Sequence, residues 1–98
     1  MWLTGRITKN RKTIFRTSDQ DFEELKKYLW WQLEDIMDVE LRLWNHNVFY
    51  SPDSSGDLDV LESMFNDLHG ISPKDFFEIN RFCEDFGIHV SISKGNLI

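Results

Sequence analysis

The chain contains very little cysteine, proline and glycine: its 98 residues include one cysteine, two prolines and five glycines. A single cysteine cannot form a disulfide within one chain, and it excludes a cysteine-based metal site unless two chains share it. We interpret Cys83 as a small buried hydrophobe on a helix. With 41% hydrophobic and 29% charged residues, the composition is typical of a folded protein, and the length fits one domain spanning 1–98.

Long hydrophobic runs are also missing. No apolar stretch approaches the roughly eighteen residues of a membrane-spanning helix, and the first residues lack the basic-then-apolar order of a signal peptide. We therefore expect a cytoplasmic protein.

Acidic residues are absent from the first 17 positions. This segment carries five bases, whereas the remaining 81 residues hold all seventeen acids against six bases, for a net charge of −6. The sequence predicts a basic N-terminal hairpin attached to an acidic body. The field of that body repels nucleic acid and attracts basic protein surfaces.

The longest periodic segment is 19–37, where apolar residues recur at steps of three and four, typical of an amphipathic helix. They are Phe22, Leu25, Leu29, Leu33 and Ile36. Thr17 and Ser18 are suitable N-cap residues, followed by acids in the first turns. We predict a helix over 18–37.

The other segments were assigned from alternation, turn residues and caps. Residues 1–17 predict a β-hairpin, in which Gly5 marks a bulge or a close approach of another backbone. Alternation of Val39, Leu41 and Leu43 predicts a second hairpin over 38–50, with a turn at 45–47 and a loop at 51–56. Two helices are predicted over 57–69, ending at Gly70, and over 72–86, ending at Gly87. A strand is predicted over 88–93.

These elements predict an α+β fold. Their order is ββαββααβ, and hairpins favour an antiparallel or mixed sheet of about five strands. Because the apolar helix faces need a cover, we expect a two-layer sandwich in which three helices cover this sheet.

Residues that would carry catalysis do not cluster. The three histidines, His46, His69 and His89, show no metal-ligand spacing, and the acids after Asp53 do not follow the order of a calcium loop. The sequence contains no glycine-rich phosphate loop and no nucleophile elbow. We expect no enzyme activity, no catalytic residue, no metal and no cofactor.

A tryptophan departs from the simple amphipathic pattern. Helical periodicity places Trp31 opposite the apolar face of its helix, among acidic residues and next to Tyr28. Exposed aromatic residues are enriched at interface hot spots. The predicted partner-binding residues are Glu24, Tyr28, Trp31, Glu34 and Asp35. In the alternative interpretation Trp31 packs under the N-terminal hairpin or another element. Trp30 lies at the border of the apolar face, and we expect it in the core.

This pattern favours a small acidic binding protein, an inhibitor or antagonist that docks on a basic surface of a partner protein. Nucleic-acid-binding enzymes are natural partners, because carboxylates can occupy a groove built for a polyanion. Phage counter-defence proteins, antitoxins and immunity proteins share this general design of a nucleic-acid mimic.

Two alternatives stay open. The hairpin bases could make the chain a nucleic-acid-binding module; they are Arg6, Lys9, Arg11, Lys12 and Arg16. The overall acidity makes nucleic acid the weaker hypothesis. Alternatively, the chain is a homodimer in which the basic hairpin of one subunit meets the acidic helix of the other and buries Trp31.

Overall fold

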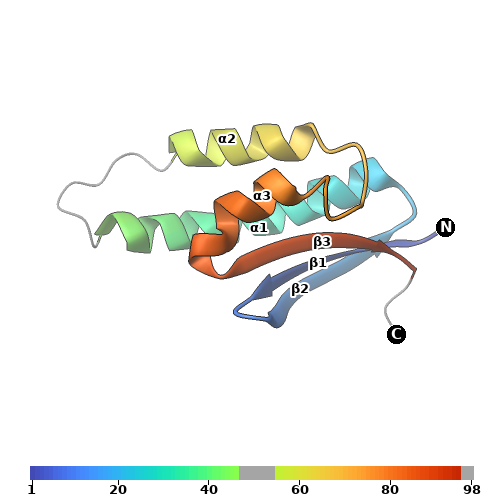
Figure 1. Ribbon diagram of the computed structural model, residues 1–98, viewed down its shortest axis with the longest axis horizontal. Coiled ribbons are helices and arrows are strands. Elements are labelled where there is room, and N and C mark those ends of the chain that lie inside the picture. Colours follow the sequence, from blue (N-terminus) through green and yellow to red (C-terminus); the bar gives the residue numbers. More distant parts are fainter. Residues whose placement is uncertain (47–54, 96–98) are drawn as a thin grey trace.

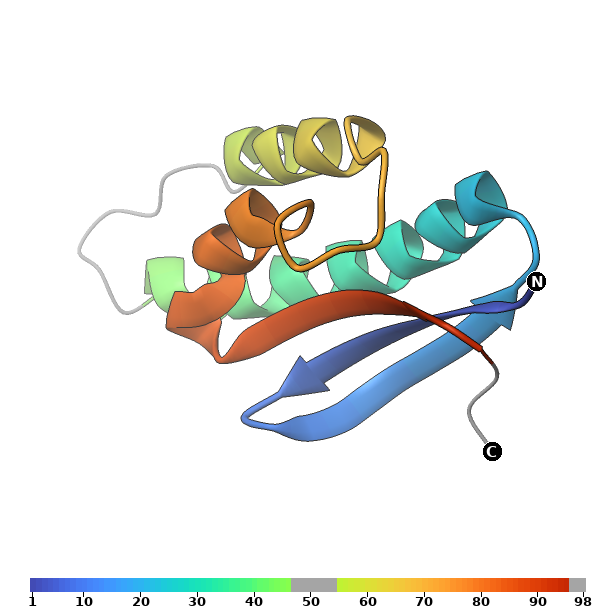
Figure 2. The same cartoon turned by 45° about the vertical axis from the view of Figure 1, so that its right-hand side comes forward.

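The computed structural model describes residues 1–46 and 55–95 and contains a three-stranded antiparallel sheet beside three helices. In chain order the elements are β1 (Leu3–Lys9), β2 (Lys12–Asp19), α1 (Phe22–His46), α2 (Ser55–Asn66), α3 (Phe77–Cys83), the 3-10 helix η1 (Glu84–Phe86) and β3 (Ile88–Lys94). The strand order is β2-β1-β3. In Figures 1 and 2, α1 and α3 lie on one face of the sheet and α2 lies above them. The predicted α+β class is confirmed.

The prediction of about five strands is wrong, because α1 continues through the segment assigned to a second hairpin. Residues Val39, Leu41 and Leu43 are helical, and only Leu41 is buried; Val39 and Leu43 are 55% and 57% exposed. A half-buried strand would place all three on one face. Instead, Leu41 continues the four-residue spacing of Leu33 and Met37, and the predicted turn residues Asn45 and His46 end the helix. The predicted return strand at 48–50 and most of the loop at 51–56 lie outside the described residues.

The start of α1 differs from the prediction as well. Thr17 and Ser18 belong to β2 and do not cap the helix. Asp21 is the cap: its carboxylate accepts a hydrogen bond from the Glu23 N–H at 3.0 Å, and its carbonyl accepts one from the Leu25 N–H at 3.0 Å. An aspartate at this position satisfies N–H groups that the first helical turn leaves unpaired.

The boundaries of the two short helices also shift. Helix α2 occupies Ser55–Asn66 rather than 57–69, and Gly70 is not a left-handed cap, since positive φ among the described glycines occurs at Gly87 and Gly95. The segment predicted as helix 72–86 begins with turns, continues as α3 and η1, and ends at Gly87 with φ 72° as predicted. Ser72 and Asp75 organise these first turns: the Ser72 N–H and hydroxyl both donate to Asp75 Oδ2, at 3.0 and 2.6 Å.

A two-residue turn joins β1 to β2. Asn10 and Arg11 both have positive φ, 51° and 71°, the pattern of a type I′ turn. The tip is fastened to the end of η1, because the Asn10 N–H donates to the Gly87 carbonyl at 2.8 Å. The Asn10 side chain also lies where a β-carbon on Gly87 would be, so Gly87 is needed for both its conformation and this close approach.

The core lies between the sheet and the helices. Its sheet side is formed by Ile7 from β1 and by Ile88, Val90 and Ile92 from β3, which confirms the predicted alternation of the last strand. Gly5 lets α1 approach the sheet, since a β-carbon at Gly5 would lie 2.5 Å from Leu29 Cδ1. The close neighbour of Gly5 is thus a helix side chain and not the backbone that was expected as the alternative to a bulge, and the bulge of this hairpin lies after Ile7.

The outer edge of β3 is capped by a side chain. The Val90 N–H donates to Asn80 Oδ1 at 2.8 Å, and Asn80 Nδ2 donates to the Val90 carbonyl at 3.0 Å. The amide of Asn80 thus bonds both backbone groups of Val90, as a residue of a neighbouring strand would. This contact fixes α3 against β3. Among the described helices, none is long and apolar enough to cross a membrane.

Candidate functional site

Trp31 and Tyr28 form an exposed aromatic pair on α1. Trp31 is 53% exposed and Tyr28 38%, and their rings meet edge to face with centroids 5.8 Å apart. The ammonium group of Lys27 lies over the indole ring. Its Nζ is 5.7 Å from the Trp31 ring centroid and 3.1 Å from Glu24 Oε1. The indole is therefore positioned by its neighbours while much of its surface stays available for contact.

The periodicity of α1 explains this exposure. Leu25, Leu29 and Leu33 are fully buried, so the opposite side of the helix faces away from the core. Trp30 turns toward α2 and packs on Phe65, with ring centroids 5.6 Å apart, as predicted for a core-bordering residue. The alternative in which Trp31 lies under the hairpin does not agree with its 53% exposure.

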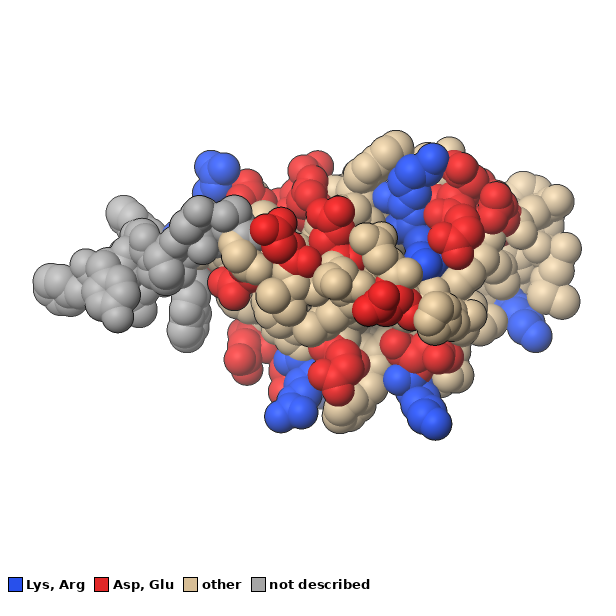
Figure 3. Space-filling view, turned by 90° about the horizontal axis from the view of Figure 1, so that it is seen from above, with Lys and Arg blue, Asp and Glu red and all other residues tan. Residues whose placement is uncertain are grey.

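All five predicted partner-binding residues lie on one side of α1. Because the helix is continuous through 24–35, their side chains fall within an arc of about 120°. Asp35 is exposed, whereas Glu24 and Glu34 are half-buried. We refer to Glu24, Tyr28, Trp31, Glu34 and Asp35 as the α1 surface. Figure 3, which looks down on the helices, shows carboxylates spread over the helical side of the molecule, with several Lys and Arg side chains among them.

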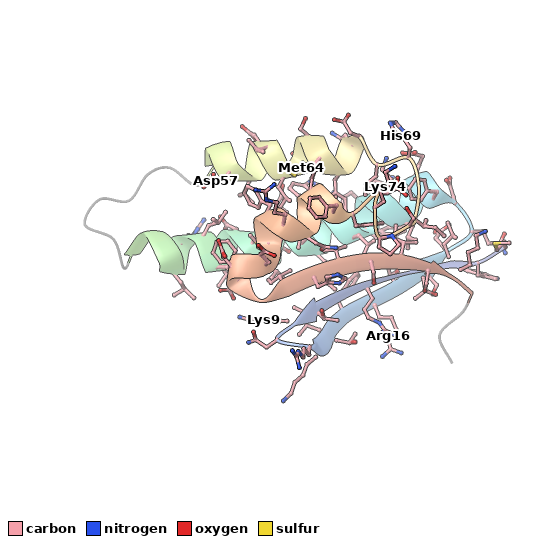
Figure 4. All side chains as sticks on the ribbon, in the orientation of Figure 1. Lys9, Arg16, Asp57, Met64, His69 and Lys74 are labelled. Atoms are coloured by element: carbon pink, nitrogen blue, oxygen red, sulfur yellow. The ribbon has the colours of Figure 1, made fainter. Side chains whose placement is uncertain are left out.

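The five hairpin bases do not form one cluster. Lys9 forms an ion pair with Glu40 of α1, on the helical side of the sheet. Arg6 and Arg16 are paired across β1 and β2 and project from the face away from the helices, because their neighbours Gly5 and Ile7 face the core. Figure 4 shows Arg16 below the sheet, opposite Asp57 and His69. Arg11 and Lys12 lie at the hairpin tip.

The sheet face away from the helices, here called the open face, has a distinct chemistry. Its three cross-strand rows contain hydroxyl side chains together with Arg6, Arg16 and His89; the other members are Thr4, Thr8, Thr13, Ser18, Ser91 and Ser93. None of these paired strand residues is acidic. The Thr4 hydroxyl lies 2.9 Å from that of Ser18 and donates to the Gly95 carbonyl.

A groove at the hairpin tip was not anticipated from the sequence. It has a volume of about 700 Å³ and lies between the β1–β2 turn, α3 and the start of β3. Its lining includes Arg11, Phe77, Arg81 and His89. Phe77 is 59% exposed. The one signal in the sequence is that Phe77 lies outside the apolar face that the spacing predicts for this helix, which is formed by Phe76, Ile79, Phe82, Cys83 and Phe86.

Metal and thiol chemistry have little support in the described part of the chain. No group of three or more His, Cys, Asp or Glu side chains within it could hold a metal ion. Cys83 is fully buried on α3, as predicted, and burial raises the pKa of its thiol to about 12. A thiol in this environment is protonated at neutral pH and is a poor nucleophile.

Comparison with known proteins identifies no relative: no protein-family model, curated protein or solved structure matches this chain.

Proposed function

We propose that this chain is a non-enzymatic binding protein that docks the α1 surface onto a basic surface of a partner protein. The observation that carries the proposal is the Tyr28–Trp31 pair, which is half-exposed, held in a defined geometry and bordered by Glu24 and Asp35. Aromatic anchors of this kind dominate the binding energy of many interfaces. Surrounding carboxylates favour a partner with a positive field.

We expect the partner to be a nucleic-acid-binding enzyme of the kind that acidic antagonists inhibit. We expect the two proteins to meet in the cytoplasm. The unpaired carboxylates matter most for this choice. Glu34 and Asp35 have no ion pair within residues 1–46 and 55–95, so they are free to meet cations of a partner. Glu24 is partly neutralised by Lys27 and contributes less.

The proposal is tested by capturing binding partners from the native host with the wild-type chain and with Trp31→Ala. Val60→Ala is the matched control, because Val60 is also an exposed apolar residue but lies on α2. We expect Trp31→Ala to weaken the identified complex by about 2 kcal/mol or more, and Val60→Ala to leave it unchanged. A folded Trp31→Ala variant that binds as tightly as the wild type would remove the α1 surface from the proposal.

A second candidate function is nucleic-acid binding through the open face. It is favoured by one observation: Arg6 and Arg16 lie side by side there, among hydroxyl groups and away from the carboxylates of the helices. Binding of this kind falls steeply with salt, because phosphate contacts release counterions. Single-stranded DNA or RNA that binds the wild type at physiological salt, but not Arg6→Glu/Arg16→Glu, would make this the leading function.

The homodimer also remains a proposal, but the fold changes which hairpin bases are available for contact with the second chain. Lys9 is engaged by Glu40 of its own chain, so the hairpin bases left for a second α1 surface are Arg6, Arg11, Lys12 and Arg16. Sedimentation of the wild type and Trp31→Ala over a range of concentrations tests it. A dimer lost in Trp31→Ala would identify the second copy as the partner.

A further inference from the structure

The groove at the hairpin tip brings together side chains from three separate segments. The turn contributes Asn10 and Arg11, α3 and η1 contribute Phe77, Arg81 and Glu84, and β3 contributes His89; together with Thr8, Asn80, Gly87 and Ile88 they line an open groove of about 700 Å³. This volume lies in the range of sites that hold small organic ligands. The groove is separate from the α1 surface, so it does not depend on the function proposed above.

Two arginines of the groove have no carboxylate partner. Among residues 1–46 and 55–95, ion pairs engage Lys9, Lys26, Lys27 and Arg42, and neither Arg11 nor Arg81. A guanidinium presents a planar fork of donors that matches two oxygens of an anion. A phosphomonoester has three outer oxygens and nearly two negative charges, so it can occupy two guanidinium groups at once.

Arg11 occupies a backbone position that does not suit it. Its φ of 71° is in the left-handed region, where a type I′ turn ordinarily has glycine at this second position. The chain thus combines Asn10, which fits the turn, with Arg11, which strains it. Strained residues of this kind cluster at functional sites, and here the strained residue places a cation in the lining of the groove.

Phe77 supplies an aromatic surface beside these cations. Among the aromatic side chains that the structure describes, Phe77 is the most exposed, at 59% against 53% for Trp31. Phe77 lines the groove, and the face of a phenyl ring can stack on a flat ring of a ligand; such base–aromatic stacking contributes substantially to nucleotide recognition. The lining therefore favours a ligand with an anionic end and an aromatic end.

The remaining walls are rigid. The Asn10 N–H bonds the Gly87 carbonyl, which fixes the turn to the end of η1. The two bonds of Asn80 to Val90 fix the orientation of its amide, so Nδ2 is the group that faces His89 Nε2 at 3.3 Å. A groove that is already formed loses little conformational entropy when it binds.

Glu84 is the one acidic side chain in the lining. A carboxylate cannot bind the phosphate itself, but it accepts hydrogen bonds from hydroxyl groups, which a ribose provides. From these contacts we propose that the groove binds a nucleotide: a phosphomonoester held by Arg11 and Arg81, joined to an aromatic base that stacks on Phe77.

The test is a titration of the isotope-labelled full chain with adenosine 5′-monophosphate, followed by NMR, with adenosine and inorganic phosphate as partial ligands. We expect saturable shifts of the Arg11, Asn80 and His89 amides with the nucleotide, and binding at least about tenfold weaker with either part alone. The 5′-monophosphates of guanosine, cytidine and uridine are titrated in parallel. Absence of saturable shifts at millimolar concentrations of all four would overturn the proposal.

Variants separate the groove from general charge effects. Arg81→Gln and Arg11→Gly should each weaken binding by about tenfold or more, since each removes one charged hydrogen-bonding group. Arg11→Gly also relieves the strained turn, so its melting temperature should equal or exceed that of the wild type. Arg42→Gln, which removes an exposed arginine of α1 that belongs neither to the groove nor to the α1 surface, is the control and should bind normally. Phe77→Ala should weaken binding, and Phe77→Trp should restore it. Equal losses in Arg42→Gln would show non-specific attraction and refute the site.

The phosphomonoester could belong to a free nucleotide or to the 5′ end of a strand. A short oligoadenylate with and without a 5′-phosphate distinguishes the two sources. A phosphorylated strand that binds more tightly than the mononucleotide identifies a strand end, and one that binds no better identifies the free nucleotide. If the unphosphorylated strand binds as well as the phosphorylated one, recognition of a phosphomonoester is wrong.

Discussion

The two faces of the sheet differ in what covers them and in the charge they carry. On one face Gly5 lies against Leu29 of α1, and Ile7 and Val90 belong to the core that the helices cover; the solvent side of the helices is rich in carboxylates. On the other face Arg6 and Arg16 stand among hydroxyl groups without any helix above them. The sheet therefore lies between an acidic surface on the helical side and a basic surface on the open face. The uneven distribution of charge along the sequence thus corresponds to two differently charged sides of the molecule.

The largest change in stability is expected when a charge is placed on the buried face of β3. The same charge on the open face of β3 provides the comparison. Val90 is fully buried and Ser91, its neighbour, belongs to the open face. Val90→Asp should destabilise the fold by about 3 kcal/mol or more, because the carboxylate would be buried without a partner. Ser91→Asp should be nearly neutral, because Ser91 lies across from Arg6 and a cross-strand ion pair becomes possible. Thermal melts check both. Similar losses in the two variants would mean that the faces do not differ as described.

The next effect compares adjacent tryptophans on the helical side. Trp30 packs on Phe65, so Trp30→Ala should cost about 2 kcal/mol or more. Trp31→Ala removes a half-exposed ring and should cost less than about 1 kcal/mol. Urea unfolding gives both free energies. A cost for Trp31→Ala that matches Trp30→Ala would identify Trp31 as a packing residue.

A smaller effect is expected at the junction between α3 and β3. Asn80→Ala removes both bonds to Val90 and leaves a part-buried N–H and carbonyl to find other partners, which should cost about 1–3 kcal/mol. Hydrogen exchange of the Val90 amide should accelerate more than that of the Ile7 amide in the central strand. Unchanged exchange at Val90 would show that the side chain does not protect this edge.

The smallest effect concerns the turns before α3, where hydrogen bonds from Ser72 lower the pKa of Asp75. Because the folded pKa lies below the unfolded one, the stabilisation is present above the unfolded pKa of about 4 and is lost as the pH falls through the folded pKa. The wild type should melt slightly above Asp75→Asn near pH 6, and the difference should shrink below about pH 4. A difference that is constant over this range would exclude the carboxylate charge as its cause.

The sequence predicted the parts of the fold that depend on a single local period. The alternation from Ile88 to Ser93 has one interpretation and was confirmed, as was the apolar face of Leu25, Leu29 and Leu33. Residues 39–43 fit both a strand and a helix, and the local pattern could not decide between them. The spacing of Leu33, Met37 and Leu41 decides it, since it extends the same buried face by two turns.

Among the candidate functional residues, too, some follow from a local sequence pattern and others come together only in the fold. The exposure of Trp31 follows from helical periodicity alone, so it could be predicted. Lys9 was grouped with the other hairpin bases, because nothing local reveals that Glu40 lies beside it in the fold. The groove unites Arg11, Phe77 and His89, which are separated by many residues. They meet because β1 pairs with β3 up to the Asn10–Gly87 contact and because α3 packs on β3.

The amide of Asn80 has a consequence for assembly. A sheet recruits further strands through the free backbone groups of its outermost strands, and exposed edges are where chains polymerise. At Val90 those groups are already occupied, so β3 resists acting as a template, and β2 is the remaining place for strand addition. If only the β2 edge can pair with another strand, two molecules can join through their β2 edges, and neither then has a free edge for a third molecule. Growth of a continuous sheet would end at a closed pair rather than a fibre.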